Sequence, residues 1–211
     1  MPELGTFLHS NEPIISLESS TGSGKTRCVP FFLSIRSIRE NCRRPFIIMT
    51  QPSANIIYPK VQDFQNILKG IKILTKVDDI INYGKNRRIN QPCLCLLTPY
   101  NALKLIKRAS KAKIDLFNRS RWVLDEVHDR TIYIDTMIGF LHQELDKVKP
   151  FPCQIVLMTA TMDQSIQKSL GKRSNNIALS DYTPYSVKEE KENVKRMRDI
   201  PQTVSRYLFK I

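Results

Sequence analysis

Short apolar runs alternate along the chain with longer segments that mix apolar and polar residues at helical spacing. Strands are expected at residues 13–18, 46–50, 71–77, 93–98, 122–126 and 154–159. Helices are expected after the first strand up to about Asn41, and then at residues 53–68, 99–112, 131–147 and 163–170. Nearly continuous apolar strands joined through helices are typical of an α/β fold, a mostly parallel sheet with helices on both faces. Such sheets bind ligands at the carboxyl ends of their strands.

The alternating pattern ends near Asp181. The residues beyond it carry mixed charge and two prolines, Pro184 and Pro201, and proline interrupts regular structure. We therefore expect one α/β domain over residues 1–180, long enough to bury its own core. Residues 181–211 are expected to form a linker or the start of a second domain.

A glycine-containing turn, Ser19-Ser20-Thr21-Gly22-Ser23-Gly24-Lys25-Thr26, lies between the first strand and the first helix. In this pattern backbone N–H groups converge on phosphate oxygens at a helix N-terminus, and glycine allows the close approach. Lys25 would bridge the β- and γ-phosphates of a nucleotide, and the Thr26 hydroxyl would bind Mg²⁺. Ser19 stands where the usual pattern has its first glycine. The alternative is a tight turn whose lysine is only solvated.

Two adjacent carboxylates, Asp125 and Glu126, end the expected strand at 122–126. An aspartate beside a phosphate loop holds Mg²⁺, usually through its water shell, because magnesium dehydrates reluctantly. Adjacent strand residues face opposite sides, so Glu126 is free to orient or deprotonate the attacking water. An isolated Asp-Glu pair is more often a solvated strand end. The phosphate loop and the apolar strand before the pair favour the metal site.

His128 follows the acidic pair, and Thr159-Ala160-Thr161 ends the next strand. A single histidine is most often structural or on the surface, and three small residues are a weak signal alone. At a strand end, however, the threonine hydroxyls are placed to hydrogen-bond the acidic pair and relay the state of the nucleotide. The ordered set, GKT, DEVH and TAT each at a strand end, is far more specific than its parts.

Over roughly residues 12–186 this set resembles the DExH/DEAH helicases of superfamily 2. The resembling segments are STGSGKT with Val29-Pro30 (motif I), residues 47–54 (motif Ia), 96–103 (motif Ib region), 125–128 (motif II), 159–161 (motif III) and 181–187 (entry to the second motor domain). DEVH together with TQP is similar to viral RNA helicases of the poxvirus nucleoside-triphosphatase type and to cellular DEAH enzymes.

The resemblance implies a RecA-like P-loop NTPase that couples ATP hydrolysis to translocation on, or unwinding of, RNA. It implies a catalytic set of Lys25, Asp125, Glu126 and His128. It implies ATP contacts from Thr21, Gly22, Ser23, Gly24, Lys25, Thr26 and Asp125, and Mg²⁺ contacts from Thr26 and Asp125. Thr159, Ala160 and Thr161 would couple hydrolysis to unwinding. Thr50, Gln51 and Thr98 would contact the nucleic-acid backbone.

The chain departs from the family in two places. Ser53 and Ala54 stand where paired arginines often follow TQP, which weakens the expected strand contact there. No segment resembles the Q-x-x-G-R-x-G-R motif of the second RecA-like domain, whose arginine fingers are worth roughly 10³–10⁵ in rate. We therefore expect either part of a longer helicase, which supplies that domain, or a truncated paralogue. The chain alone should bind nucleotide better than it hydrolyses it.

The charge supports a polyanionic partner, because 33 Lys and Arg against 20 Asp and Glu leave a net charge of +13. Lys104, Lys107, Arg108 and Lys111 recur at helical spacing and form one basic face. The alternative is an ordinary solvated helix face. Lys85, Arg87 and Arg88 are expected in a surface loop. Because neither cluster includes aromatic platforms, recognition of single-stranded or duplex RNA, or of DNA, should be directed to the backbone.

The remaining composition indicates an intracellular protein. The N-terminus lacks the pattern of a signal peptide, and no apolar run is long enough to span a bilayer. The cysteines are Cys28, Cys42, Cys93, Cys95 and Cys153. Their odd number and irregular spacing favour free thiols in a reducing compartment. Cys93 and Cys95 are expected on one face of a strand and not as half of a zinc site.

Two other classes of function remain open. A nucleotide kinase would also use a phosphate loop, but it should show a lid or an arginine-rich acceptor site. A truncated helicase paralogue that binds nucleotide and RNA without catalysis is the other alternative. The intact GKT and DEVH segments favour an ATP-dependent enzyme.

Overall fold

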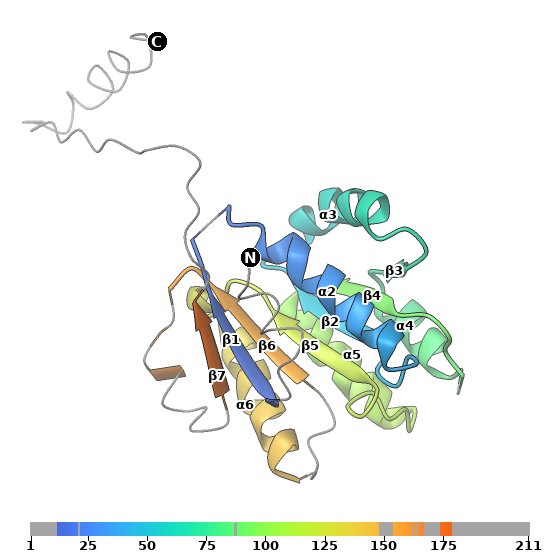
Figure 1. Cartoon of the computed structure of the whole chain (residues 1–211). Helices are drawn as coiled ribbons and strands as arrows, with labels where there is room; N and C mark the ends of the chain where they lie inside the picture. The colour runs from blue at the N-terminus through green and yellow to red at the C-terminus, as the bar shows by residue number, and fades with distance from the viewer. Residues whose placement is uncertain are drawn as a thin grey trace, which may run out of the picture. The chain divides into compact units, whose positions relative to one another are not determined.

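A seven-stranded parallel sheet forms the centre of the part of the chain that the structure describes, in the order β3-β4-β2-β5-β6-β1-β7 (Figure 1). This computed structural model describes residues 12–20, 22–86, 88–147, 154–161, 163, 165–166 and 174–178. The strands are β1 (Ile14–Glu18), β2 (Phe46–Thr50), β3 (Lys72–Leu74), β4 (Cys93–Leu97), β5 (Ser120–Leu124), β6 (Gln154–Thr159) and β7 (Ser174–Ala178). All six strand pairings are parallel. The expected α/β fold is confirmed.

Helices cover both faces of the sheet. They are α2 (Lys25–Arg39), α3 (Ala54–Ile67), α4 (Val77–Gly84), α5 (Pro99–Lys111), α6 (Ile132–Lys147) and the short 3-10 helix η1 (Val127–Asp129). On one face Leu17 packs with Val29 of α2, and on the other Trp122 packs with Leu105 of α5 and Leu141 of α6. Strands buried on both sides have no polar face, which explains their continuous apolar sequence.

The residues around the third strand differ from the prediction. The strand β3 ends at Leu74, and Val77 begins α4, a helix that the sequence analysis did not predict. Val77 and Ile80 of α4 are buried, and Asp78 and Asp79 lie in its first turn, where negative charge stabilises the helix dipole. Only two turns long, α4 gives too few repeats for its periodicity to stand out.

The edge strand β7 was also missed. It pairs with β1 from Ser174 to Ala178, at one end of the sheet. Its first three residues, Ser-Asn-Asn, lack the apolar run of a central strand. An edge strand has a neighbouring strand on one side only, so it does not need such a run. Most of the helix expected at residues 163–170 and all of residues 181–211 lie outside the described residues. The proposed division at residue 180 therefore stays a prediction.

One charged side chain is buried near the amino ends of the strands, opposite the carboxyl ends where the site is expected. Arg121 of β5 is fully buried, forms an ion pair with Glu40, and donates to the carbonyl of Arg44 at 3.2 Å. Burial alone would raise the pKa of the Glu40 carboxyl, but attraction to Arg121 and hydrogen bonds from Arg36 and Arg121 outweigh it and lower that pKa. The pair explains how an arginine fits inside an apolar strand.

The described cysteines are free thiols, as expected, while Cys153 lies outside the described residues. Cys93 and Cys95 are buried on β4 with their sulfurs 3.8 Å apart. Burial raises the pKa of the Cys95 thiol well above its ordinary value, which disfavours the thiolate that zinc requires. Among the described residues no three His, Cys, Asp or Glu side chains gather as a metal site. No described helix has both the length and the apolar character needed to cross a bilayer.

Candidate functional site

The carboxyl ends of four neighbouring strands place the expected motifs side by side. Glu18 at the end of β1 pairs with Thr159 at the end of β6, and Thr50 of β2 pairs with Leu124 of β5. β5 and β6 are also adjacent and parallel. Segments far apart in sequence therefore leave the sheet at one edge, where parallel sheets bind ligands.

The glycine-containing turn leads directly into α2. Gly22 and Gly24 have φ angles of +86° and +83°, a region that costs other residues about 1–2 kcal/mol. No acidic side chain lies in the first turn of α2, and no side chain caps its N-terminus. Within the described part of the chain, the start of α2 therefore offers backbone N–H groups and partial positive charge, the arrangement that binds phosphate.

Lys25, the first residue of α2, is 4% exposed. Its Nζ donates to the carbonyls of Ser19 at 3.1 Å and Ser20 at 3.4 Å, so the amine lies inside the turn. Ser19 does not have a positive φ, and its N–H continues the sheet by donating to the Thr159 carbonyl at 3.1 Å. The backbone at Ser19 therefore does not require glycine. Thr21 lies outside the described residues.

Asp125 follows β5 and is 2% exposed. Its Oδ2 accepts hydrogen bonds from Thr26 Oγ1 and from Gln51 Nε2, both at 3.2 Å. Its Oδ1 is buried and has no hydrogen-bond partner among the described residues. A carboxylate held on one oxygen, with the other oxygen unpaired among the described residues, and beside a threonine hydroxyl matches the hard oxygen ligands that Mg²⁺ prefers.

Thr50 and Gln51 support Asp125 from the end of β2. Thr50 Oγ1 accepts from the Asp125 N–H at 3.3 Å, and Gln51 Nε2 reaches the carboxylate. Both residues are 0% exposed, so in this structure their side chains do not reach a nucleic acid. Their burial does not support the expected contact with nucleic acid. Both side chains point toward Asp125, to which they form hydrogen bonds.

Lys60 of α3 was missed by the sequence analysis. Its Nζ donates to Gln51 Oε1 and lies 3.6 Å from Asp125 Oδ2. A single lysine on a helix carries no signal of a site, because solvated lysines are common there. Only the packing of α3 brings the Lys60 amine close to Asp125.

Glu126 has left the strand. The strand β5 ends at Leu124, and Glu126 adopts a left-handed conformation with φ 53° and ψ 49° at the start of η1. The expected strand through residue 126 is therefore wrong at its end. The two carboxylates diverge because of this left-handed residue and not because of strand alternation. Such a conformation is uncommon without glycine and is often found at functional sites.

His128 connects the acidic segment to the end of β6. Its Nδ1 lies 3.3 Å from both Thr159 Oγ1 and Glu126 Oε2. The hydroxyl hydrogen of Thr159 goes to the Thr161 carbonyl at 2.7 Å, so Nδ1 of His128 must be the donor toward Thr159. The sequence analysis expected Thr159 to contact the acidic pair. In the structure Thr159 contacts His128 instead. Ala160, between the threonines, is half-buried.

Part of this set, the start of α2 with Lys60 and Glu126, lines one pocket of about 340 Å³. It is lined by Gly22, Gly24, Lys25, Thr26, Arg27, Lys60, Asp63, Phe64 and Glu126. Two of its lining residues, Arg27 and Asp63, form an ion pair, with Nε and Oδ2 2.9 Å apart. The structure thus brings the glycine-containing turn and the acidic segment together around a space bearing cations and a glutamate.

The expected nucleic-acid residues of α5 lie on the other face of the sheet. Lys104, Lys107 and Lys111 are exposed, while Arg108 forms an ion pair with Asp78 of α4. Thr98 accepts from the Asn101 N–H at 3.3 Å and caps α5. Three of the four cations therefore remain available to a polyanion.

Comparisons with known proteins agree with this arrangement. A family model described as DEAD/DEAH box helicase matches residues 6–169. The chain is 27% identical over 164 residues to the probable ATP-dependent RNA helicase DHR2 of Saccharomyces cerevisiae, a match that covers 76% of this chain and 20% of that protein.

Two solved structures are similar in fold. One is Mss116p, deleted at its NTE and C-tail and bound to ssRNA and AMP-PNP, with a TM-score of 0.59 and 17% identity over 82% of this chain and 38% of that one. The other is the helicase domain of Hef from Pyrococcus furiosus, with a TM-score of 0.56 and 14% identity over 84% of this chain and 38% of that one. The expected RecA-like fold is confirmed, and the chain spans much less than the full length of these relatives.

Proposed function

This chain belongs to the DEAD/DEAH box helicase family, and from that premise we propose that it is an ATP-binding motor domain that couples ATP hydrolysis to movement along RNA. The main support for this proposal is the hydrogen bond from Thr26 Oγ1 to Asp125 Oδ2. It joins the first turn of α2 to the acidic end of β5, as a site for a nucleotide and its metal requires. Family membership disfavours the nucleotide-kinase alternative.

The residues present fit ATP and Mg²⁺. The N–H groups at the start of α2 and the Lys25 amine would hold the phosphates. Thr26 and the unpartnered Oδ1 of Asp125 would hold the metal, directly or through its water shell. Bound Mg²⁺ supplies neutralisation of the charge that develops on the phosphates.

Glu126 would orient and deprotonate the attacking water, since its carboxylate lines the pocket and is separate from the metal-side carboxylate. The His128–Thr159 contact at 3.3 Å would transmit the state of the acidic segment to the end of β6. Thr159 to Thr161 would thereby couple the nucleotide to RNA.

We further propose the DExH subtype, on the DEVH sequence at residues 125–128, and a viral-type enzyme on DEVH together with TQP. RNA as the substrate is supported by the likeness to DHR2, a probable RNA helicase, and to Mss116p with its bound ssRNA. A second RecA-like domain would complete the nucleotide site, since the chain covers only 38% of the solved chain of Mss116p and 38% of that of Hef.

The function is tested by nucleotide binding and phosphate release with and without single-stranded RNA. We expect the chain to bind a fluorescent ATP analogue, to bind it more weakly when EDTA removes Mg²⁺, and to release phosphate faster when RNA is added. Absence of nucleotide binding would refute the proposal. Magnesium-dependent binding without any turnover would support nucleotide binding alone, which is the result expected of a non-catalytic paralogue and of a domain that needs a second RecA-like domain for hydrolysis.

Replacing Lys60 by alanine is expected to weaken ATP binding by roughly 10-fold, because a charged hydrogen-bonding group in the pocket is worth about 1.5–3 kcal/mol. Lys60→Arg should retain most of the affinity, since it keeps the charge. Titration with a fluorescent ATP analogue measures both. Lys69→Ala, an equal loss of charge beside the end of α3 and outside the pocket, is the control. Unchanged or tighter binding by Lys60→Ala would show that Lys60 does not serve the nucleotide.

A further inference from the structure

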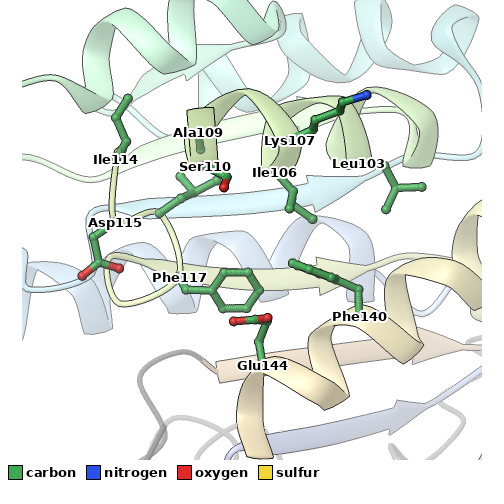
Figure 2. Close-up of a pocket in the computed structure, with 11 residues that line it drawn as sticks. Leu103, Ile106, Lys107, Ala109, Ser110, Ile114, Asp115, Phe117, Phe140 and Glu144 are labelled. Atoms are coloured by element: carbon green, nitrogen blue, oxygen red, sulfur yellow. The ribbon is translucent and has the colours of Figure 1, made fainter. Parts of the chain in front are cut away.

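Two hollows of different character lie along α5. The first, of about 500 Å³, is enclosed by α5, the loop after it and α6 (Figure 2). Phe117 and Phe140 line it, with the Glu144 carboxylate beside Phe117 and the Asp115 carboxylate on the loop after α5. Figure 2 shows the amine of Lys107 directed away from these rings. Carboxylates at this hollow repel a polyanion.

The second hollow, of about 460 Å³, is built from cations and aromatic rings. Its lining residues are Tyr100, Leu103, Lys104, Lys107, Arg108, Lys111 and Tyr133. The α5 members recur three or four positions apart and so share one helix face. Across the described ranges, no ion pair neutralises Lys104, Lys107 or Lys111. This hollow therefore has a net positive charge and complements phosphate.

Two tyrosines stand in this hollow. Tyr100 lies in the first turn of α5 and is 54% exposed, and Tyr133 lies in the first turn of α6 and is 45% exposed. Their ring centroids are 5.5 Å apart, with the ring planes at 67°. In this edge-to-face pairing the edge of one ring meets the face of the other, so neither ring is covered on both faces. The pair holds both rings in place without burying them.

We propose that an unpaired base of single-stranded RNA stacks on the Tyr100–Tyr133 pair while Lys104, Lys107 and Lys111 hold the flanking phosphates. Aromatic rings beside a cationic track are the combination by which proteins bind single strands with little sequence preference. The inference deepens the proposed function and rests on it. It adds a base contact to the backbone contacts that the sequence analysis expected, because Tyr133 joins the basic face only when α6 packs beside α5.

The two tyrosines lie close in sequence to the strand end at Thr98 and to the segment that contains His128. Tyr100 follows β4 directly after Thr98 and Pro99, at the carboxyl edge of the sheet. Tyr133 lies in the first turn of α6, shortly after η1, which contains His128. A base bound there would lie between the strand ends and the segment that follows the acidic pair. The pocket that contains Lys25 does not include either tyrosine.

The test is fluorescence anisotropy with a labelled single-stranded RNA and with an abasic oligomer of the same length. Tyr100→Ala and Tyr133→Ala should each weaken binding of the RNA at least roughly 5-fold, the lower end for loss of one stacked base. Tyr100→Phe and Tyr133→Phe should bind as the wild type does, because the ring remains. The tyrosine variants should leave binding of the abasic oligomer unchanged.

Salt dependence separates the tyrosines from the lysines. Alanine at Lys104, Lys107 or Lys111 should reduce the slope of log affinity against log salt by about 0.7 for each phosphate that the variant no longer neutralises, whereas Tyr→Ala should leave the slope unchanged. Phe31→Ala and Lys69→Ala are the matched controls, because they alter an aromatic and a cation at a separate hollow between α2 and α3. Circular dichroism and thermal melting would confirm that each variant is folded.

The outcomes are distinguishable. Equal weakening for RNA and abasic oligomer, or tyrosine variants that bind as the wild type does, would overturn the stacking platform while leaving RNA binding intact. Equal binding of polyglutamate at matched charge, also abolished in the tyrosine variants, would assign the hollow to an acidic peptide instead. If the wild type binds ATP but no RNA at any salt concentration, the proposed RNA substrate fails together with this inference.

Discussion

Replacing Lys25 by alanine is expected to weaken ATP binding on the order of 100-fold. The Lys25 amine is buried within the glycine-containing turn and donates to the carbonyls of Ser19 and Ser20. In the complex it would exchange these acceptors for phosphate oxygens, which form stronger, charge-assisted hydrogen bonds. Two such bonds at about 1.5 kcal/mol each, the lower end of the range for charged groups, account for the expected loss. Titration with a fluorescent ATP analogue in the presence of Mg²⁺ measures it.

Two further variants make this result interpretable. Lys25→Met keeps the apolar stem in the turn and tests whether the charge alone is required. Arg39→Ala removes a cation from the exposed last turn of the same helix and should leave the affinity within about 2-fold, as expected for a distant surface charge. If Lys25→Ala binds the analogue as tightly as the wild type, the turn is not a phosphate site.

The second large effect is expected at Glu126. Glu126→Gln should leave ATP binding within about 2-fold of the wild type and slow RNA-stimulated phosphate release by roughly 10²–10⁴, the range for loss of a general base. An amide of the same shape is unable to accept the proton of the attacking water. Single-turnover hydrolysis is the appropriate measurement, since it detects a slow rate and separates chemistry from product release.

The control for Glu126 is Asp79→Asn, the same charge change on the exposed first turn of α4. It should alter neither binding nor turnover. A Glu126→Gln variant that turns over at the wild-type rate would show that another group handles the water. Weak binding combined with normal turnover would place Glu126 among the nucleotide contacts instead.

Much of the fold was predictable because a central parallel strand must be apolar on both faces. The runs at Phe46–Thr50 and Cys93–Leu97 are fully buried strands, as their sequences indicated. Short or edge elements escaped prediction. The strand β7 lies at the edge of the sheet and needs no apolar run, and α4 is too short to show a clear period.

For the site, the order of motifs along the sequence predicted that Lys25, Thr26 and Asp125 would converge. Parallel strands make this inference reliable, since their carboxyl ends meet at one edge. Glu126, Thr50, Gln51 and Lys60 needed coordinates. Neither the left-handed turn at Glu126 nor the burial of Gln51 can be read from local pattern, because each depends on what packs against it.

The sequence by itself determined the parallel sheet, the glycine-containing turn and the acidic pair that follows a strand, because these depend on residue type and on spacing within one segment. Tertiary structure alone decided which side chains support Asp125, and that Tyr133 lies beside Tyr100 and the basic face of α5. These contacts join separate helices and strands. Their geometry follows from how buried surfaces fit together, and no local stretch of sequence contains that information.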